Sequence, residues 1–318
     1  MGTSLQPHAD IPAATTNGST GSAASLHDLL TEKSNEATRG LDTRSALEIA
    51  RIINQEDQKI AAAVKKAIPE IAQVIDTVAH ALREGGRLIY IGAGSSGRLA
   101  ALDACEIPAY FSTSPQTVQY IMAGGPKALA SPVEVNEDSE ELGKRDIARR
   151  RPSRKDVVIG LSASGRTPYV VGGIEYARRL GALTIGISSV PGSPLANAAE
   201  IAITPETGPE VVTGSTRLKA GTAAKLVLNM LSTGSLVRMR YVYGNLMVNL
   251  QPTNAKLNDR AARIVSTITG LDYDAARHLL ARAGSVKTAV VMHQLKLERP
   301  QAELRLSAAR GRLKDALQ

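Results

Sequence analysis

The apolar positions in the first third of the chain repeat at the spacing of helices. Between residues 45 and 83 they recur every three or four residues, on one helix face; they are Leu47, Ile49, Ile52, Ile53, Ile60, Val64, Ile68, Ile71, Val74, Ile75, Val78 and Leu82. Pro69 lies inside this stretch and predicts a break between two helices. Gly85 and Gly86 follow it and predict the end of the second helix. Two amphipathic helices therefore lead into the rest of the fold.

Short continuous apolar runs come next and predict buried strands. They occupy residues 87–91, 118–122, 157–161, 182–187 and 201–203. Helical stretches separate them: a short helix over 99–105 that ends before Pro108, an exposed charged helix over 139–150, and one that begins at Pro168. Strands that alternate with helices predict an α/β fold with a doubly wound, mostly parallel sheet.

The character of the chain changes after the last predicted strand. Residues 223–239 predict a long helix, and residues 258–318 predict short amphipathic helices with Gly270 and Gly284 between them. We therefore predict three parts. Residues 1–28, rich in Ala, Thr, Ser and Gly, form a disordered tail; residues 29–257 form the sheet domain with its N-terminal helices; residues 258–318 form a small helical C-terminal domain.

Composition limits the partners and the compartment. The 318 residues include no Trp and one Phe, so the base-stacking platforms of many nucleic-acid modules are missing. Of the net charge of +8, residues 144–156 carry +5, which fits a solvated helix face or a phosphate-backbone patch; we expect no nucleic-acid partner. The single Cys105 excludes an internal disulfide and fits a reducing compartment. With no apolar run of about 20 residues and no signal-like start, we expect a cytoplasmic protein without membrane contact.

Two loops rich in glycine and serine follow two of the predicted strands. The first spans Gly92 to Arg98, and the second spans Ser162 to Thr167. A strand that ends in such a loop and opens a helix presents backbone amides, hydroxyls and the positive end of a helix dipole at one point. The two copies predict a phosphorylated ligand held at the carboxyl ends of a parallel sheet.

The first loop also satisfies the Gly-x-Gly-x-x-Gly pattern of dinucleotide-binding folds. That pattern requires an acidic residue at the end of the second strand to hold the ribose. Here the second strand ends in Met122-Ala123-Gly124-Gly125, without an acid. The second loop carries hydroxyls rather than glycines, which favours a phosphate monoester. A dinucleotide cofactor is therefore not expected.

Metal and nucleophile motifs are also missing from the sequence. The histidines have no metal-ligand spacing; they are His8, His27, His80, His278 and His293. Neither Gly-x-Ser-x-Gly nor the P-loop pattern occurs, so the loop serines are better interpreted as hydrogen-bond donors than as nucleophiles. We expect neither a metal nor another cofactor.

Carboxylates remain as candidates for proton transfer. Glu106 lies between Cys105 and Ile107-Pro108, and desolvation in such apolar surroundings would raise its pKa and suit it to general acid catalysis. The alternative is a capped or salt-bridged structural glutamate. A cluster before the charged helix offers further acids, among which spacing does not choose; they are Glu134, Glu137, Asp138, Glu140 and Glu141. Glu210 and Lys219 border a polar turn that could contact an anion or simply cap the long helix.

Five segments together resemble the N-acetylmuramic acid 6-phosphate etherase family. They are residues 31–35 (TEKSN), 91–98 (IGAGSSGR), 102–108 (LDACEIP), 162–169 (SASGRTPY) and 208–221 (GPEVVTGSTRLKAG). The resemblance covers nearly the whole chain except the tail, and motifs of this length are highly specific. One departure is Ser95-Ser96 where the family commonly has Thr-Ser, which exchanges one hydroxyl for another.

The resemblance implies a sugar-isomerase-type (SIS) domain and a lyase that releases D-lactate from N-acetylmuramic acid 6-phosphate. It places the proton-donating glutamate at Glu106 and the second catalytic glutamate at Glu137, and thus makes the choice that spacing leaves open. The phosphate-holding hydroxyls fall on Ser162, Ser164 and Thr167, with Ser96 from the first loop. The resemblance further implies a homodimer with sites near the subunit interface. Two alternatives share these motifs or this sheet: a non-catalytic phosphosugar sensor like the glucokinase regulatory protein, and an aldose–ketose isomerase.

Overall fold

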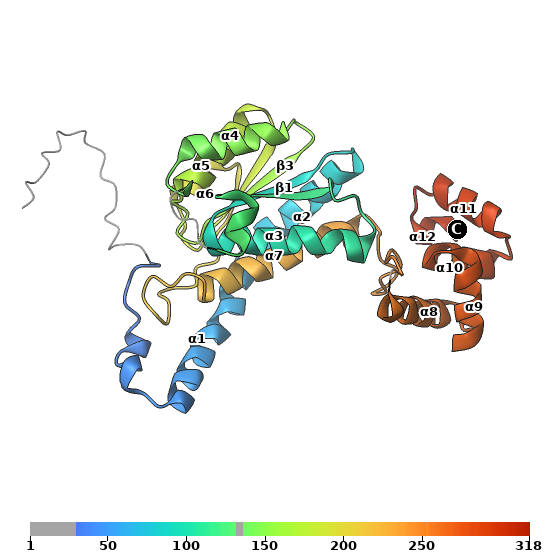
Figure 1. The fold of residues 1–318 in the computed structure, drawn as a ribbon, viewed down its shortest axis with the longest axis horizontal. Coiled ribbons are helices and arrows are strands. Elements are labelled where there is room, and N and C mark those ends of the chain that lie inside the picture. Colours follow the sequence, from blue (N-terminus) through green and yellow to red (C-terminus); the bar gives the residue numbers. More distant parts are fainter. Residues whose placement is uncertain (1–29, 132–135, 253) are drawn as a thin grey trace, which may run out of the picture.

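The computed structural model describes residues 30–131, 136–252 and 254–318, and its centre is a five-stranded parallel sheet (Figure 1). The strands are β1 (Leu88–Gly92), β2 (Val118–Met122), β3 (Val157–Leu161), β4 (Leu183–Ile187) and β5 (Ile201–Ile203). Their order in the sheet is β2-β1-β3-β4-β5, and every neighbouring pair is parallel. The predicted sheet is confirmed, and all five of these strands lie within one residue of the predicted runs.

Helices cover both faces of the sheet, as a doubly wound fold requires. One face is covered by α2 (Ile68–Arg83), α3 (Gly94–Phe111) and α7 (Lys219–Arg238), and α1 (Ala46–Lys66) packs against α7 outside this layer. The other packs against α4 (Glu140–Arg150), α5 (Pro168–Arg179) and α6 (Pro194–Ala198). Because both faces are covered, β1 and β3 are buried along their whole length. This explains why their sequences are continuous apolar runs.

The helix boundaries follow local signals in the N-terminal part. Ser45 caps α1 through a capping box with Glu48. Pro69 lies in the first turn of α2, where its missing N–H has no cost, so the predicted break between the two helices is confirmed. The described residues also contain three short 3-10 turns: η2 (Glu36–Thr38) and η3 (Leu41–Thr43) precede α1, and η4 (Gly125–Leu129) follows β2.

Two helices extend beyond their predicted bounds. The helix predicted over 99–105 begins at Gly94 and continues past Pro108 to Phe111, so Glu106 lies inside α3 rather than after it. Proline normally breaks a helix, but α3 packs between β1, β2 and α7, and the burial of Ile107 and Phe111 beside the proline holds the last turn. The long helix predicted from residue 223 begins at Lys219. The carboxylate of Glu210 caps it by accepting the backbone N–H groups of Lys219 and Ala220.

The C-terminal helices form a second hydrophobic core of their own. They are α8 (Ala255–Thr269), α9 (Tyr273–Ala283), α10 (Val286–Leu295), α11 (Arg299–Ala308) and α12 (Leu313–Ala316). Gly270 and Gly284 end α8 and α9 in the left-handed conformation, which confirms their predicted role. The predicted domain boundary at residue 257 falls inside α8. Val248 and Leu250 already belong to the C-terminal core, and the predicted tail lies outside the described residues.

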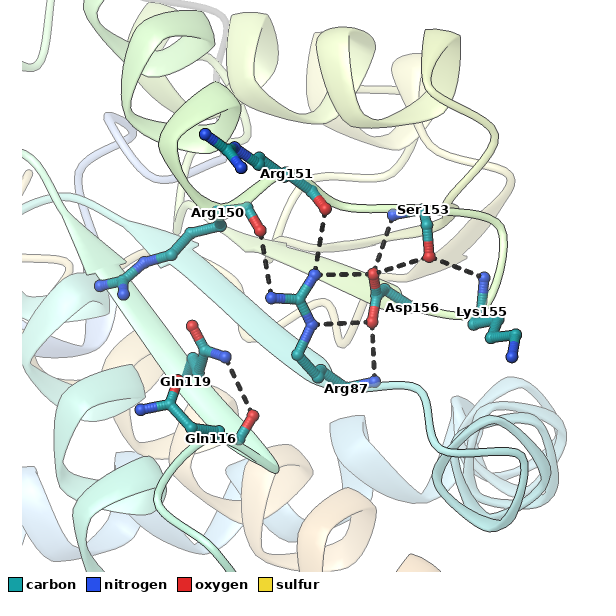
Figure 2. A network of polar contacts seen from close by, with 8 residues as sticks. All are labelled: Arg87, Gln116, Gln119, Arg150, Arg151, Ser153, Lys155 and Asp156. Atoms are coloured by element: carbon teal, nitrogen blue, oxygen red, sulfur yellow. Dashed lines mark hydrogen bonds and ion pairs between the residues drawn. The ribbon is translucent and has the colours of Figure 1, made fainter.

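The amino ends of β1 and β3 are joined by an ion pair between the half-buried Arg87 and the buried Asp156 (Figure 2). The guanidinium of Arg87 donates to both carboxylate oxygens of Asp156, at 3.0 and 2.9 Å, and to the backbone carbonyls of Arg150 and Arg151. Burial opposes the ionisation of Asp156, but the hydrogen bonds from Arg87 outweigh it and lower its pKa. This network fixes the turn between α4 and β3. Across the described residues, no helix is long and apolar enough to span a bilayer.

Candidate active site

The two glycine-and-serine loops lie side by side at the carboxyl edge of the sheet. The loop after β1 opens α3, and the loop after β3 opens α5. These strands are neighbours, and their connections leave toward opposite faces, which makes this the point where a doubly wound fold forms its ligand crevice. The sheet order therefore brings together the two loops that the sequence predicts to share one ligand.

The first loop holds the start of α3 tightly against the end of β1. A Cβ atom on Gly92 would lie 2.7 Å from the backbone nitrogen of Gly97, so only glycine fits there. The N-cap residue Ala93 supplies no side-chain hydrogen bond to the first turn of α3. The first backbone amides of this helix, with the dipole behind them, are thus available to an anion. Ser96 lies in this first turn and is half-buried.

The second loop turns its hydroxyl groups toward one another. The side-chain oxygens of Ser162 and Thr167 lie 2.8 Å apart, and Ser162 also accepts the backbone N–H of Gly165 at 3.1 Å. The hydroxyl of Ser164 accepts the backbone N–H of Arg166. Gly165 has a φ of +67°, and a Cβ there would lie 2.1 Å from Oγ of Ser193. Both the conformation and the space require glycine.

A third loop, which the sequence analysis did not include, completes the edge. Ser188 and Ser189 follow β4 and are buried. The Ser189 N–H donates to the carbonyl of Ala163 at 2.9 Å, which locks this loop to the previous one. The sequence contained a signal for this loop, because an apolar strand is again followed by a turn with serine, proline and glycine, at residues 188–193.

These loops enclose a small pocket above the ends of β3 and β4. Its described lining combines four serines with apolar residues, and none of these residues is charged; they are Ser96, Leu161, Ser162, Ala163, Ile187, Ser188, Ser189, Pro205, Ala220 and Ala224. An anion here would be held by hydroxyls, backbone amides and the α3 dipole rather than by an ammonium or guanidinium. That equipment suits a phosphate monoester.

Glu137 lies at the rim of the first loop. Its backbone carbonyl accepts the N–H of Tyr169 in the first turn of α5, at 3.0 Å. Its carboxylate oxygen Oε2 lies 4.0 Å from the position that a Cβ on Gly94 would occupy. Glu137 is half-buried, so the structure places one of the two family glutamates beside the start of α3, close to the pocket.

Glu106 does not lie in this pocket within one chain. It follows Ser96 by ten residues along α3, and at 1.5 Å per residue this separates them by about 15 Å. Its side chain is exposed, so the expected apolar surroundings are not present in the described chain. The same face of α3 also exposes Leu102 and Tyr110, at 44% and 39%, together with Cys105.

A buried polar network holds the turn of α3 that carries Glu106. Asp103, three residues earlier, accepts the hydroxyl of Tyr90 in β1 and the hydroxyl of Ser232 in α7, both at 2.9 Å. Burial raises the pKa of Asp103, although these two hydrogen bonds stabilise its charged form. The network fastens α3 to the sheet on one side and to α7 on the other. Asp103 lies within the motif at residues 102–108, but no role was predicted for it.

Glu210 and Lys219 are fully buried and engaged inside the protein rather than in the pocket lining. The carboxylate of Glu210 accepts the backbone N–H groups of Lys219 and Ala220, at 2.8 and 2.9 Å, which is the helix-cap alternative. The ammonium of Lys219 donates to Glu56 of α1 at 2.8 Å. Burial opposes the ionisation of Glu56, but hydrogen bonds from Lys219, Lys59 and Asn35 outweigh it and lower its pKa to about 2.

Asn35 connects this buried charge centre to the N-terminal segment. Its amide donates to Glu56 at 3.0 Å and to the carbonyl of Pro209 at 3.3 Å. Two of the motifs that carry the resemblance, residues 31–35 and 208–221, therefore meet in space. Among the described residues, no three His, Cys, Asp or Glu side chains gather closely enough to hold a metal ion.

Comparison with known proteins agrees with this architecture. Residues 70–178 match the family model of the glucokinase regulatory protein N-terminal SIS domain, and residues 141–234 match the SIS domain model. The chain is 49% identical over 294 residues to the N-acetylmuramic acid 6-phosphate etherase of Clostridium beijerinckii, covering 92% of this chain and 97% of that one.

Two further relatives carry the same name. The protein of Cronobacter sakazakii is 49% identical over 294 residues and is covered to 99%, and that of Klebsiella aerogenes is 50% identical over 293 residues and is covered to 98%. In both comparisons 92% of this chain is matched. With its parallel sheet, its SIS domain and this likeness over nearly the full length, the chain belongs to the N-acetylmuramic acid 6-phosphate etherase family.

Proposed function

We propose that this protein is a lyase that cleaves the D-lactyl ether of N-acetylmuramic acid 6-phosphate, giving N-acetylglucosamine 6-phosphate and D-lactate. The observation that carries the proposal is the identity of 49% over 92% of the chain to relatives that bear this enzyme's name. An uncharged, hydroxyl-lined pocket at the end of the sheet supports it, because such a pocket fits the 6-phosphate. The reaction would serve the recycling of cell-wall amino sugars.

The phosphate is assigned to the hydroxyls of Ser162, Ser164 and Thr167, with Ser96 from the first turn of α3. The 2.8 Å contact between Ser162 and Thr167 supports this assignment, because it orients two hydroxyls toward one point before any ligand arrives. Ser188 and Ser189 join the set through their place in the pocket lining. Glu210 and Lys219 act at one remove, by fixing the start of α7, whose Ala220 and Ala224 line the same pocket.

The chemistry is an elimination followed by hydration. In the open-chain sugar, the aldehyde acidifies the proton on carbon 2, and the Glu137 carboxylate removes it. The electron pair forms the double bond between carbons 2 and 3, the bond from carbon 3 to the ether oxygen breaks, and protonated Glu106 gives its proton to the departing lactate oxygen. Water then adds its oxygen to carbon 3, and a proton returns to carbon 2. This balance of atoms needs only water as co-reactant.

The two glutamates meet, in this proposal, across the interface of a homodimer. One chain alone keeps Glu106 about 15 Å along α3 from the pocket serine Ser96. Glu106 shares its exposed helix face with Leu102, Cys105 and Tyr110, and an exposed apolar face of this kind is typical of a subunit contact. A second copy packed on α3 would desolvate Glu106, as a general acid requires, and present it to the partner's pocket.

The site belongs to the sheet domain, and we propose that the helices from α8 onward form a separate accessory domain, since residues 243–317 share their own core. The exposed thiol of Cys105 on the proposed interface favours a reducing compartment, and we place the enzyme in the cytoplasm.

The alternative function, a non-catalytic phosphosugar sensor, is disfavoured, because the relatives that match 92% of the chain are named as etherases.

Isotope labelling tests the reaction. The enzyme is incubated with N-acetylmuramic acid 6-phosphate in deuterium oxide or in ¹⁸O-water, and both products are analysed by mass spectrometry. Elimination and hydration place deuterium on carbon 2 and ¹⁸O on carbon 3 of the sugar, and leave the lactate oxygen unlabelled. Binding without lactate release would favour the sensor, and a ketose product would favour an isomerase.

Substitution of each glutamate tests its role. Glu106→Gln and Glu137→Gln should each lower lactate release at least about 100-fold; near-normal turnover of either variant removes that residue from the mechanism.

A further inference from the structure

A groove on the side of the sheet away from the pocket lies between α4 and the edge strand β2. Its described lining comes from the end of β2, the following turn and the last part of α4; the residues are Tyr120, Ile121, Met122, Gly125, Pro126, Asp146, Arg149 and Arg150. None of them lines the pocket of the proposed reaction. The groove therefore combines the edge of β2 with a basic wall, which Arg149 and Arg150 of α4 form.

The strand edge offers backbone groups to a partner. Within the described part of the chain β2 pairs only with β1, because it is the first strand in the sheet order. The carbonyl of Thr117 and the N–H of Ala123 face β1, so alternation along the strand turns the backbone of Tyr120 and Met122 outward. The guanidinium of Arg150 donates to the outward carbonyl of Tyr120 at 3.4 Å, which confirms this direction; a partner strand would replace this contact and release Arg150 for a carboxylate.

The basic wall has more positive charge than the chain itself neutralises. Arg145 and Arg149 share one carboxylate, that of Asp146, which also accepts the hydroxyl of Tyr169 at 2.9 Å. Arg150 and Arg151 form no ion pair within the described residues. Arg149 and Arg150 line the groove beside Asp146, and Arg145 and Arg151 add two positive charges from the same segment, so that residues 145–151 carry a net charge of +3.

The backbone that carries these arginines is rigid and locally strained. Figure 2 shows the carbonyls of Arg150 and Arg151 bound to the guanidinium of Arg87, while the two arginine side chains point away from it. Arg151 adopts a φ of +48°, where glycine would avoid a cost of about 1 kcal/mol.

We propose that this groove binds an extended acidic segment of a partner protein, which adds to β2 as a further strand and places its carboxylates against Arg149 and Arg150. Main-chain hydrogen bonds to the edge would supply affinity, and the arginines would supply the preference for acidic side chains. A nucleic acid fits less well. The edge of β2 offers backbone hydrogen-bonding groups in a ladder, which only a peptide can match.

The test uses a fluorescein-labelled heptapeptide of alternating glutamate and valine, and fluorescence anisotropy with the full chain. Three competitors are compared: the same sequence with lysine in place of glutamate, the acidic peptide N-methylated at alternate residues, and a 20-base-pair DNA duplex. We expect the unlabelled acidic peptide to displace the probe at least about 10-fold better than each competitor. Equal displacement by the N-methylated peptide, or better displacement by DNA, overturns the proposal.

Matched variants locate the site. Arg149→Glu with Arg150→Glu reverses two charges in the last turn of α4, and Arg178→Glu with Arg179→Glu makes the same change in the last turn of α5. The α4 pair should weaken binding at least about 10-fold and the α5 pair less than about 2-fold. Equal losses in the two variants would assign the binding to general charge and overturn the groove. Circular dichroism melting checks that each variant is folded. Because the measured quantity is peptide binding, the outcome is independent of whether the chain releases lactate.

Discussion

The ammonium of Lys219 lies 2.8 Å from the carboxylate of Glu56, and the two side chains join the first turn of α7 to the middle of α1 in a place that water barely reaches. Exposure is 1% for Lys219 and 3% for Glu56. Because α7 lines the pocket and α1 does not, this ion pair transmits the position of the N-terminal helices to the candidate site.

Removing one member of this pair should strongly destabilise the fold. Glu56→Gln leaves the Lys219 ammonium buried without a counter-charge, and such a loss costs about 3–5 kcal/mol. Glu36→Gln is the matched control, because its ion pair with Arg39 is exposed at 72% and 77% and should contribute less than about 1 kcal/mol. Urea unfolding at pH 7 measures both. Similar free energies of unfolding for the two variants would show that the buried pair is not a structural tie.

The same glutamate makes stability depend on acid. The pKa of Glu56 is about 2 in the folded chain and falls from an ordinary value of 4.5, so its contribution is complete above about pH 4.5. That contribution is lost as the pH falls toward 2, because the unfolded chain takes up the proton first. The free energy of unfolding should therefore fall less steeply between pH 4.5 and 2 in Glu56→Gln than in the parent chain. Parallel pH profiles would contradict this assignment.

The interlocked loops predict a sharp difference between two glycines. Gly165→Ala combines a φ of +67° with a Cβ only 2.1 Å from Oγ of Ser193, so the phosphate loop must shift. Gly192→Ala has nearly the same backbone strain, with a φ of +66°, but its Cβ meets nothing within 4 Å. We expect the first variant to raise KM for the phosphosugar at least about 10-fold, and the second to raise it less than about 3-fold. Equal KM values would place the phosphate elsewhere.

A mixture of two inactive variants tests whether the glutamates meet across an interface. If Glu106 of one subunit serves the pocket that holds Glu137 of the partner, a dimer of one Glu106→Gln chain and one Glu137→Gln chain contains one intact site. Refolding equal amounts together should then restore about a quarter of the parent lactate release, since about half of the dimers are mixed. Lack of recovery in dimers shown to be mixed by native mass spectrometry would place both glutamates of a site in one chain.

Much of the fold follows from local patterns. The strands β1 and β3 are buried on both faces, so each appears as an unbroken apolar run, and the glycine-and-serine loops mark where they end. The start of α5 at Pro168 and the ends of α8 and α9 at Gly270 and Gly284 follow from backbone geometry that involves only neighbouring residues. These features were predictable because their causes lie within a few residues of each other.

Other features depend on contacts between distant parts of the chain. α3 continues past Pro108 because packing on β1, β2 and α7 outweighs the local cost of proline. Glu210 caps α7 across a loop of several residues, and Lys219 is neutralised by Glu56 from 163 positions away. Spacing suggested an anion site for these two residues, but burial gives them structural partners.

The sequence by itself determined the alternating strands and helices, the two phosphate-type loops and, through long motifs, the family. Only the tertiary structure decided that Ser188 and Ser189 join those loops, that Glu137 lies beside the start of α3, and that Glu106 lies on an exposed face far along the same helix. Local conformation is written in neighbouring residues, whereas the distance between two side chains on different elements is set by how those elements pack.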